Sequence, residues 1–396
     1  MTWFNDKRLG LFVHWGIYAI PAVHEQFWQR WNVPAEEYVK YADRFNPVNF
    51  DPAKWLDLAQ EAGMEYLCFT TKHHDGYCMW DTSQTDFNVM NSPYGRDILA
   101  ELAEECHKRD FPLVLYYSVV DWHHPAYPNI GRHHEIVTDP SKHSMNAYME
   151  FLKAQIRELC TNYGKIYGIW WDMNVPEHVD ESVHDMIKEL QPDALINNRG
   201  FGRGDFSTPE RDFDPEGANV HGGTGYTLTE ACQSVGVNSW GYRKEEDYFS
   251  FAYFKRNIDS WLAKGCNYLL NVGPDANGEI PPEAVRIMKD VGTWIKPIRD
   301  SFNGSPVRIV DNSKVLAMRD GRNYYIHCPE GLDSSTLDLY PFAKEPETVT
   351  LLNTGEELSW TTEPTTYRRH IEEKTLRLRE IPVNELTGPP VFKITV

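Results

Sequence analysis

Short apolar runs alternate with amphipathic segments up to about residue 300, and this alternation limits the folds that the chain can adopt. The runs have the length of buried strands, and the segments between them repeat apolar residues at helical spacing. Several of these segments open with Asp or Pro and close with Gly, as helices do. Repeated strand–helix units of this kind predict a parallel sheet covered by helices.

The expected strands and helices make up seven or eight strand–helix units. We expect strands over 10–16, 65–74, 112–120, 165–173, 194–199 and 267–274, with a poorly marked pair between 205 and 242. We expect helices over 51–63, 96–110, 145–164 and 247–265. Seven or eight units indicate a (β/α)8-like TIM barrel, and an open doubly wound sheet is the alternative. No G-x-G-x-x-G or Walker loop follows any strand, whereas polar or aromatic residues end most of them, which favours the barrel.

The sequence changes character after an expected helix over 281–302. From Ser305 onward, short alternating runs are separated by Gly, Pro, Asn and Asp, a pattern typical of a β-sandwich. We therefore predict two domains, a (β/α) barrel catalytic domain over 1–302 and a C-terminal β-sandwich domain over 303–396.

The net charge of −19 argues against a nucleic acid or an anionic membrane as a partner, because both would be repelled. No apolar stretch approaches the length of a membrane span. The N-terminal MTWFNDKRLGLF lacks the basic start and apolar core of a secretory signal, which predicts a cytoplasmic protein. The oligomeric state, a homo-oligomer included, is left open.

The seven cysteines are spread singly, with no C-x-x-C pair. Their distribution predicts reduced core residues and supports neither a disulfide framework nor a zinc site. Fifteen histidines and many carboxylates leave a metal-dependent barrel hydrolase as an alternative, but no metal-ligand spacing favours it. We expect no metal and no cofactor.

Asp172 stands at the carboxyl end of the expected strand KIYGIWWDM. Side chains alternate along a strand, so Trp170 and Asp172 point the same way. A carboxylate beside an indole at the mouth of a barrel suits a glycosidase nucleophile, and a helix cap or a salt bridge is the structural alternative.

Three histidines also end expected strands, His14 in FVHWG and His73 and His74 in TTKHHDGY. Adjacent histidines are poorly spaced for one metal ion, so hydrogen bonds to hydroxyl groups of a ligand are the better interpretation. A purely structural role is the alternative for each of them.

Seven segments, in this order and spacing, resemble glycoside hydrolase family 29, the α-L-fucosidases. They are GLFVHWG (10–16), KHHDGY (72–77), YYSVVDWHHP (116–125), IWWDMN (169–174), NNRG (197–200), SWGYR (239–243) and GCNYLLNVGPDANGEIP (265–281). The resemblance implies a (β/α)-type barrel with a C-terminal β-sandwich, no metal, and hydrolysis with retention of anomeric configuration.

The resemblance also implies roles for individual residues. It makes Asp172 the nucleophile and places Trp170 and Trp240 beside the C6 methyl group and ring face of the sugar. The residues that it implies for binding the fucose hydroxyls are His14, His73, His74, Tyr117 and Arg199, and Glu25 matches a further hydroxyl contact.

The acid/base is the less fixed assignment, because the family carries it in a variable loop region. Glu210 resembles the position that it occupies in several members, Glu230 is the alternative acid/base, and Glu216 is a third candidate. The implied function is exo-acting release of terminal α-L-fucose from oligosaccharides or glycoconjugates through a covalent fucosyl-enzyme. Two other functions stay open, a barrel glycosidase for a related sugar such as an α-L-galactoside and a catalytically inactive fucose-binding protein.

Overall fold

A computed structural model describes residues 3–128, 136, 138–173, 175, 178–210, 228–310, 314–364 and 374–396. Seven parallel strands of these residues form one sheet in the order β5-β4-β3-β2-β1-β7-β6. The strands are β1 (Leu9–Val13), β2 (Tyr66–Lys72), β3 (Leu113–Ser118), β4 (Gly168–Asp172), β5 (Leu195–Ile196), β6 (Glu230–Ser234) and β7 (Asn267–Val272).

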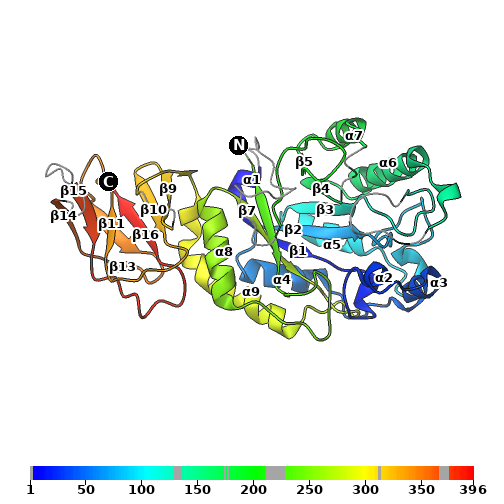
Figure 1. Cartoon of the computed structure of the whole chain (residues 1–396), viewed down its shortest axis with the longest axis horizontal. Coiled ribbons are helices and arrows are strands. Elements are labelled where there is room, and N and C mark those ends of the chain that lie inside the picture. The colour runs from blue at the N-terminus through cyan, green and yellow to red at the C-terminus, as the bar shows by residue number, and fades with distance from the viewer. Residues whose placement is uncertain are drawn as a thin grey trace.

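Helices follow most strands and cover the outer face of the sheet (Figure 1). They are α4 (Pro52–Glu61), α5 (Ile98–Lys108), α6 (Met145–Asn162), α7 (Ser182–Leu190), α8 (Phe251–Ala263) and α9 (Pro282–Ile295), with the short α1 (Trp3–Asp6), α2 (Phe27–Arg30) and α3 (Ala35–Tyr38). The side chains of Asp51, Asp97, Ser144 and Ser250 cap the N-termini of α4, α5, α6 and α8. The predicted parallel α/β architecture is confirmed.

The sheet has seven regular strands where a (β/α)8-like barrel has eight. Residues 206–210 occupy the gap between β5 and β6 and make only isolated parallel bridges, Asn197↔Phe206, Ser207↔Thr229 and Glu210↔Cys232. Pro209 lies within this segment and lacks the backbone N–H that a regular ladder needs. The segment therefore joins the curled sheet without forming a strand of its own.

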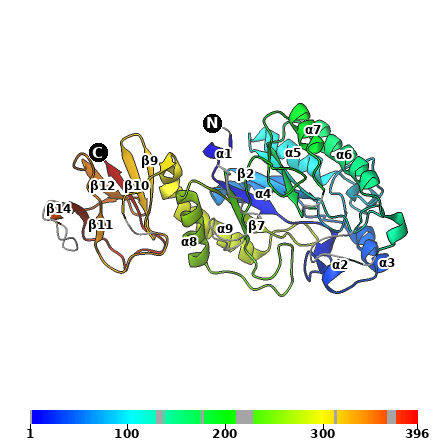
Figure 2. The ribbon, with the colours of Figure 1, turned by 45° about the horizontal axis from the view of Figure 1, so that its top comes forward.

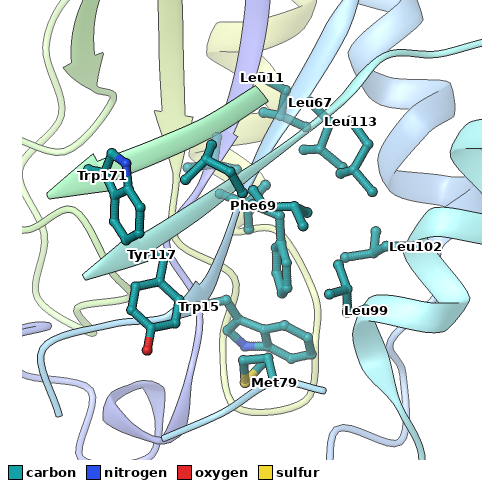
Figure 3. Packing of buried hydrophobic residues seen from close by; sticks show 14 of the residues in the cluster. Leu11, Trp15, Leu67, Phe69, Met79, Leu99, Leu102, Leu113, Tyr117 and Trp171 are labelled. Carbon is teal, nitrogen blue, oxygen red and sulfur yellow. The ribbon is translucent and has the colours of Figure 1, made fainter. Parts of the chain in front are cut away.

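The two faces of the sheet carry different side chains, because successive residues of a strand point to opposite sides. Phe12, Tyr66, Tyr116, Trp170 and Cys232 belong to one cluster on the inner face. The outer face packs on the helices. Figure 3 shows part of that outer cluster, with the labelled side chains Leu11, Leu67, Phe69, Leu99, Leu102, Leu113, Tyr117 and Trp171.

The C-terminal part forms two antiparallel sheets that lie beyond α8, at the other end of the molecule from α6 and α7 (Figures 1 and 2). One sheet has the order β13-β12-β16-β10-β9-β8 and the other β11-β15-β14. The strands are β8 (Ser305–Pro306), β9 (Leu316–Asp320), β10 (Asn323–His327), β11 (Leu337–Leu339), β12 (Thr348–Leu351), β13 (Glu356–Glu357), β14 (Trp360–Pro364), β15 (Lys374–Leu378) and β16 (Val391–Thr395). A separate apolar cluster fills this part.

A buried hydrogen bond links the two parts of the chain. His327 of β10 lies 2.7 Å from Asp259 of α8, and both side chains are fully buried. Phe302 stacks on the His327 ring at 4.9 Å. Burial raises the pKa of Asp259, although His327 acts in the opposite direction. The pair lies away from the strand ends that carry the candidate site.

All seven cysteines are free, and all but Cys266 are buried. Within the described ranges, no three His, Cys, Asp or Glu side chains are grouped so that they could hold a metal ion. None of the helices in that part of the chain is long and apolar enough to cross a membrane.

Candidate active site

Asp172 is the last residue of β4, and each of its carboxylate oxygens accepts a hydrogen bond from a residue outside this strand. Tyr116 of β3 donates to Oδ2 at 2.8 Å, and Arg199 donates to Oδ1 at 3.1 Å. The Nε2 atom of His74 lies 3.8 Å from Oδ2. The side chain keeps 13% exposure. Donors that bind a carboxylate favour its ionised form, so these hydrogen bonds stabilise negative charge on Asp172.

The backbone turns sharply directly after Asp172. Met173 has a φ of 62°, a left-handed conformation that costs a residue with a side chain free energy. In this conformation the Met173 N–H donates to Asp172 Oδ1 at 3.0 Å. The strained residue thus adds a third donor to the carboxylate.

Arg199 lies just beyond β5 and joins the two candidate catalytic carboxylates. Its Nη1 atom donates to Asp172 Oδ1 at 3.1 Å and to Glu210 Oε2 at 3.0 Å. Thr208 fixes the rest of the guanidinium, accepting from Nε and Nη2 at 2.8 Å each. Two oxygens this close to one nitrogen cannot be more than about 6 Å apart, which accommodates the separation of about 5–5.5 Å found in retaining glycosidases.

Arg199 is buried, and its charge is compensated by these two carboxylates. Burial alone would lower the pKa of Arg199, but Glu210 and Asp172 raise it above its ordinary value. The guanidinium carbon also lies 4.7 Å from the ring centroid of Trp170, a cation–π contact. A permanent positive charge is therefore fixed between the carboxylates.

Glu210 is carried by the irregular segment between β5 and β6. The Cys232 N–H donates to Pro209 O at 3.2 Å, which ties this segment to β6 at the position of Glu210. The Glu210 side chain is 31% exposed, against 13% for Asp172. Of the two carboxylates, Glu210 is thus the one nearer to solvent, where a leaving group would stand.

His14 follows β1, and its ring is held in one orientation. The amide nitrogen of Asn271 donates to Trp240 O at 2.7 Å, so the amide oxygen must accept from His14 Nδ1 at 2.7 Å. Burial lowers the pKa of His14, although Glu25 and Asn271 act in the opposite direction. A neutral His14 with its proton on Nδ1 keeps Nε2 as an acceptor for a sugar hydroxyl.

His73 and His74 follow β2 with their ring centroids 4.0 Å apart. The Ser118 hydroxyl donates to Val120 O at 2.7 Å and so accepts from His74 Nδ1 at 2.6 Å. The rings of His14 and His73 lie 5.6 Å apart. The three predicted histidines are therefore brought together beside Asp172.

The loop that carries the two adjacent histidines is fixed by buried charges on either side. Lys72 forms a fully buried ion pair of 2.7 Å with Asp121. Asp75 accepts from the Tyr38 hydroxyl at 2.8 Å and from the Tyr77 N–H at 3.1 Å. Burial raises the pKa of Asp75 to about 7, so it tolerates protonation near neutral pH.

Glu25 binds the loop that carries Trp240. Its Oε2 accepts from the Ser239 hydroxyl at 2.6 Å and from the Trp240 N–H at 3.0 Å. Burial would raise the pKa of Glu25, but His24 and Ser239 lower it below its ordinary value. The Trp240 ring lies 5.3 Å from that of His14. Glu25 thus positions Trp240, and its predicted contact with a sugar hydroxyl stays a prediction.

The prediction for Tyr117 is wrong, because its side chain leaves the sheet on the helical face. The Tyr117 hydroxyl donates to Gln155 of α6 at 2.6 Å, and the ring lies in the outer cluster shown in Figure 3. The residue before it, Tyr116, points inward and binds Asp172. The signal was present in the sequence, since Tyr117 shares its strand face with Leu113 and Leu115, which are typical of a helix-packed surface.

The alternative acid/base Glu230 lies inside the sheet and is only 2% exposed. It begins β6, whereas Asp172 ends β4, and these are opposite ends of parallel strands. Its Oε1 accepts from Trp170 Nε1 at 2.9 Å and its Oε2 from the Tyr66 hydroxyl at 2.6 Å. Glu230 is therefore beneath Trp170, and Glu210 is the candidate that the structure brings to Asp172. Glu216 lies outside the described residues.

Sequence comparison assigns the chain to a known family. Residues 1–298 match the family described as alpha-L-fucosidase. The chain belongs to this family. The tissue alpha-L-fucosidase of Bos taurus is 28% identical over 410 residues, which span 92% of this chain and 82% of that protein. The tissue alpha-L-fucosidase of Homo sapiens is 26% identical over 409 residues, with coverages of 92% and 83%.

Solved α-L-fucosidases share the fold along nearly the whole chain. Alpha-L-fucosidase isoenzyme 1 from Paenibacillus thiaminolyticus is 33% identical with a TM-score of 0.86, over 99% of this chain and 97% of that one. A family 29 α-L-fucosidase from Bacteroides thetaiotaomicron, trapped as a covalent intermediate with 2-fluoro-fucosyl fluoride in a mutant with one glutamate replaced by glutamine, is 28% identical with a TM-score of 0.82, over 99% and 94%. As a family member, this chain is an α-L-fucosidase, a glycoside hydrolase.

Proposed function

We propose that this α-L-fucosidase is a retaining, exo-acting enzyme that releases terminal α-L-fucose from oligosaccharides or glycoconjugates. Asp172 is the nucleophile and Glu210 the acid/base. The observation that carries the proposal is the position of Arg199 Nη1, which binds an oxygen of each carboxylate at 3.1 and 3.0 Å. The limit of about 6 Å that this sets between the two oxygens is compatible with the separation of about 5–5.5 Å in retaining glycosidases and supports a covalent glycosyl-enzyme.

In the first half-reaction, an oxygen of Asp172 forms a bond to C1 of the sugar as the bond from C1 to the leaving oxygen breaks. Glu210 delivers its proton to that oxygen, so the aglycone departs as a neutral alcohol. The step requires Glu210 to carry this proton while Asp172 attacks as a carboxylate.

In the second half-reaction, water attacks C1 and Glu210 takes up the proton of that water. The bond between C1 and Asp172 breaks, and Asp172 leaves as a carboxylate. Tyr116, Arg199 and the Met173 N–H stabilise this returning negative charge. Two inversions at C1 give net retention.

Exo action is supported by the buried surroundings of Asp172. His14, His73 and His74 are 2–5% exposed, and Trp240 stands beside His14. The imidazoles offer hydrogen bonds to hydroxyls, and the indole offers an apolar face to the sugar ring or its methyl group. Such a site suits one terminal sugar with its aglycone directed toward Glu210.

Product analysis tests the proposal. Wild-type protein is incubated with a panel of fucosylated oligosaccharides of defined linkage, and the first-formed sugar is followed by proton NMR. We expect free fucose as the only small product and the α anomer first. Release of the β anomer first would contradict retention, and release of larger fragments would contradict exo action.

A further inference from the structure

Glu230 is a buried carboxylate that the proposed mechanism does not use. It is 2% exposed, and it interacts with Tyr66, Cys68 and Cys232 of the apolar inner-face cluster. A charged group in such a place is costly unless it is well bonded. Both of its oxygens are bonded, one to the Tyr66 hydroxyl at 2.6 Å and one to Trp170 Nε1 at 2.9 Å. The bond to Trp170 connects it to the active site.

Trp170 in turn contacts both side chains that donate to the nucleophile. Its ring stacks on Tyr116, with 5.6 Å between centroids and an interplanar angle of 17°. The guanidinium of Arg199 lies over the same indole at 4.7 Å. Tyr116 and Arg199 bind the two oxygens of Asp172. The indole therefore forms the floor beneath the nucleophile's hydrogen-bond donors.

We propose that Glu230 is a positioning residue for the fucosidase reaction: by accepting the Trp170 Nε1 hydrogen bond, it fixes the indole against which Tyr116 and Arg199 are aligned on Asp172. Glu230 contacts neither substrate nor reacting atoms. The inference rests on the proposed role of Asp172 and gives the alternative acid/base candidate of the sequence a task other than proton transfer. A donor displaced by a fraction of an ångström loses much of its stabilisation of the transition state.

The hydrogen-bond pattern makes this role depend on ionisation. Both partners donate to Glu230, so the ionised form accepts both bonds, whereas a protonated carboxyl group must use one oxygen as a donor. Burial raises the pKa of Glu230 to about 7, while Tyr66, Trp170 and Arg199 lower it in part. The titratable groups that interact with it are Tyr66 and Cys68 of β2, Cys232 of β6, and Arg199.

Two variants separate charge from hydrogen bonding. Glu230→Gln imitates the protonated carboxyl group, and Glu230→Met removes both acceptors. We expect kcat of Glu230→Gln to be about 3- to 10-fold below wild type above pH 7.5, with the difference disappearing as the pH falls below about 6. We expect Glu230→Met to lose about 100-fold above pH 7.5 and less below pH 6, where Glu230 of the wild type is itself protonated.

The leaving group distinguishes positioning from proton transfer. We expect Glu230→Met to lose the same factor in kcat/KM on an aryl α-L-fucoside and on a fucosylated oligosaccharide, and azide to give no rescue. Covalent labelling of Asp172 by 2-fluoro-fucosyl fluoride should also slow about 100-fold, because fluoride departs without an acid and the defect lies in the nucleophile's surroundings. Glu210→Gln should be labelled at nearly the wild-type rate.

The control is Asp259→Asn, which neutralises another buried carboxylate far from the site and should leave kcat and its pH profile unchanged. If Glu230→Met does not fold, Glu230→Gln and Tyr66→Phe replace it in the test. We expect Tyr66→Phe to lower kcat/KM about 3-fold, by the same factor on both substrates. A folded Glu230→Met with wild-type rates would overturn the proposal. A larger loss on the oligosaccharide with azide rescue would make Glu230 the acid/base. If 2-fluoro-fucosyl fluoride does not label the wild-type protein, the proposed function itself is contradicted.

Discussion

Tyr116 and Tyr117 are consecutive residues of β3, yet their hydroxyls serve opposite faces of the sheet. Tyr116 donates to Asp172 at 2.8 Å, and Tyr117 donates to Gln155 of α6 at 2.6 Å. Because both are buried and both lose one hydrogen bond when changed to phenylalanine, they form a matched pair for separating catalysis from stability.

We expect Tyr116→Phe to lower kcat/KM about 10- to 100-fold, the loss of one hydrogen bond to a charged group. Tyr117→Phe should keep kcat/KM within about 2-fold of wild type and lower the melting temperature by a few degrees. Steady-state rates on an aryl α-L-fucoside and thermal denaturation measure the two effects. Equal rates for the two variants would contradict the assignment of the faces.

Arg199→Lys keeps a positive charge but removes the planar fork that binds two carboxylates and Thr208 at once. We expect kcat/KM to fall by at least about 100-fold while the protein stays folded. Arg109→Lys, which alters a surface arginine paired with Asp57 and Glu105, is the control and should leave the rate unchanged. A mild effect of Arg199→Lys would show that charge alone suffices at this position.

Glu210→Ala should separate substrates by their leaving groups. An acid contributes about 10²- to 10⁴-fold when the leaving oxygen is a poor one, and much less for an aryl group. We expect the loss on a fucosylated oligosaccharide to exceed that on an aryl α-L-fucoside at least 10-fold, with azide restoring part of the aryl rate and yielding a fucosyl azide of retained configuration. Equal losses on both substrates would remove Glu210 from proton transfer.

The pH dependence of the free energy of unfolding should also reveal the ionisation of Glu230. Its pKa is about 7 in the folded protein against an ordinary 4.5, so the folded state binds the extra proton between these values. Wild-type stability from this group therefore falls as the pH rises from about 4.5 to about 7. Glu230→Gln lacks this slope. Its free energy of unfolding relative to wild type should thus rise by up to about 3 kcal/mol across that window in urea titrations. Parallel curves would contradict the raised pKa.

Much of the fold could be predicted from local patterns. Helices α4, α5, α6 and α8 carry capping side chains, and the strands of a buried parallel sheet read as apolar runs. Helix α7 was not predicted, although Asp180 stands just before it and accepts from the Ser182 N–H at 3.1 Å, a start signal that the sequence offered. The segment 206–210 was poorly marked because it pairs through isolated bridges around Pro209.

The candidate site was predictable where a polar residue ends a strand, as with Asp172, His14 and His74. Tyr116 was missed although alternation along the strand places it opposite Leu113 and Leu115, because the family resemblance pointed to its neighbour Tyr117. Asn271 was missed for another reason, since its task is to orient His14 rather than to contact substrate. The sequence alone did not exclude Glu230 as the acid/base. The structure separates the two candidates, because Glu230 lies beneath Trp170 and Glu210 lies beside Arg199.

The proposed mechanism depends most directly on Asp172 as the residue that bonds to the sugar. Wild-type protein is treated with 2-fluoro-fucosyl fluoride, digested, and mapped by tandem mass spectrometry. We predict one fluorofucosyl group per chain, attached to Asp172, and none on Asp172→Asn. A label on any other side chain, or a fully active enzyme that takes up no label, would contradict the account.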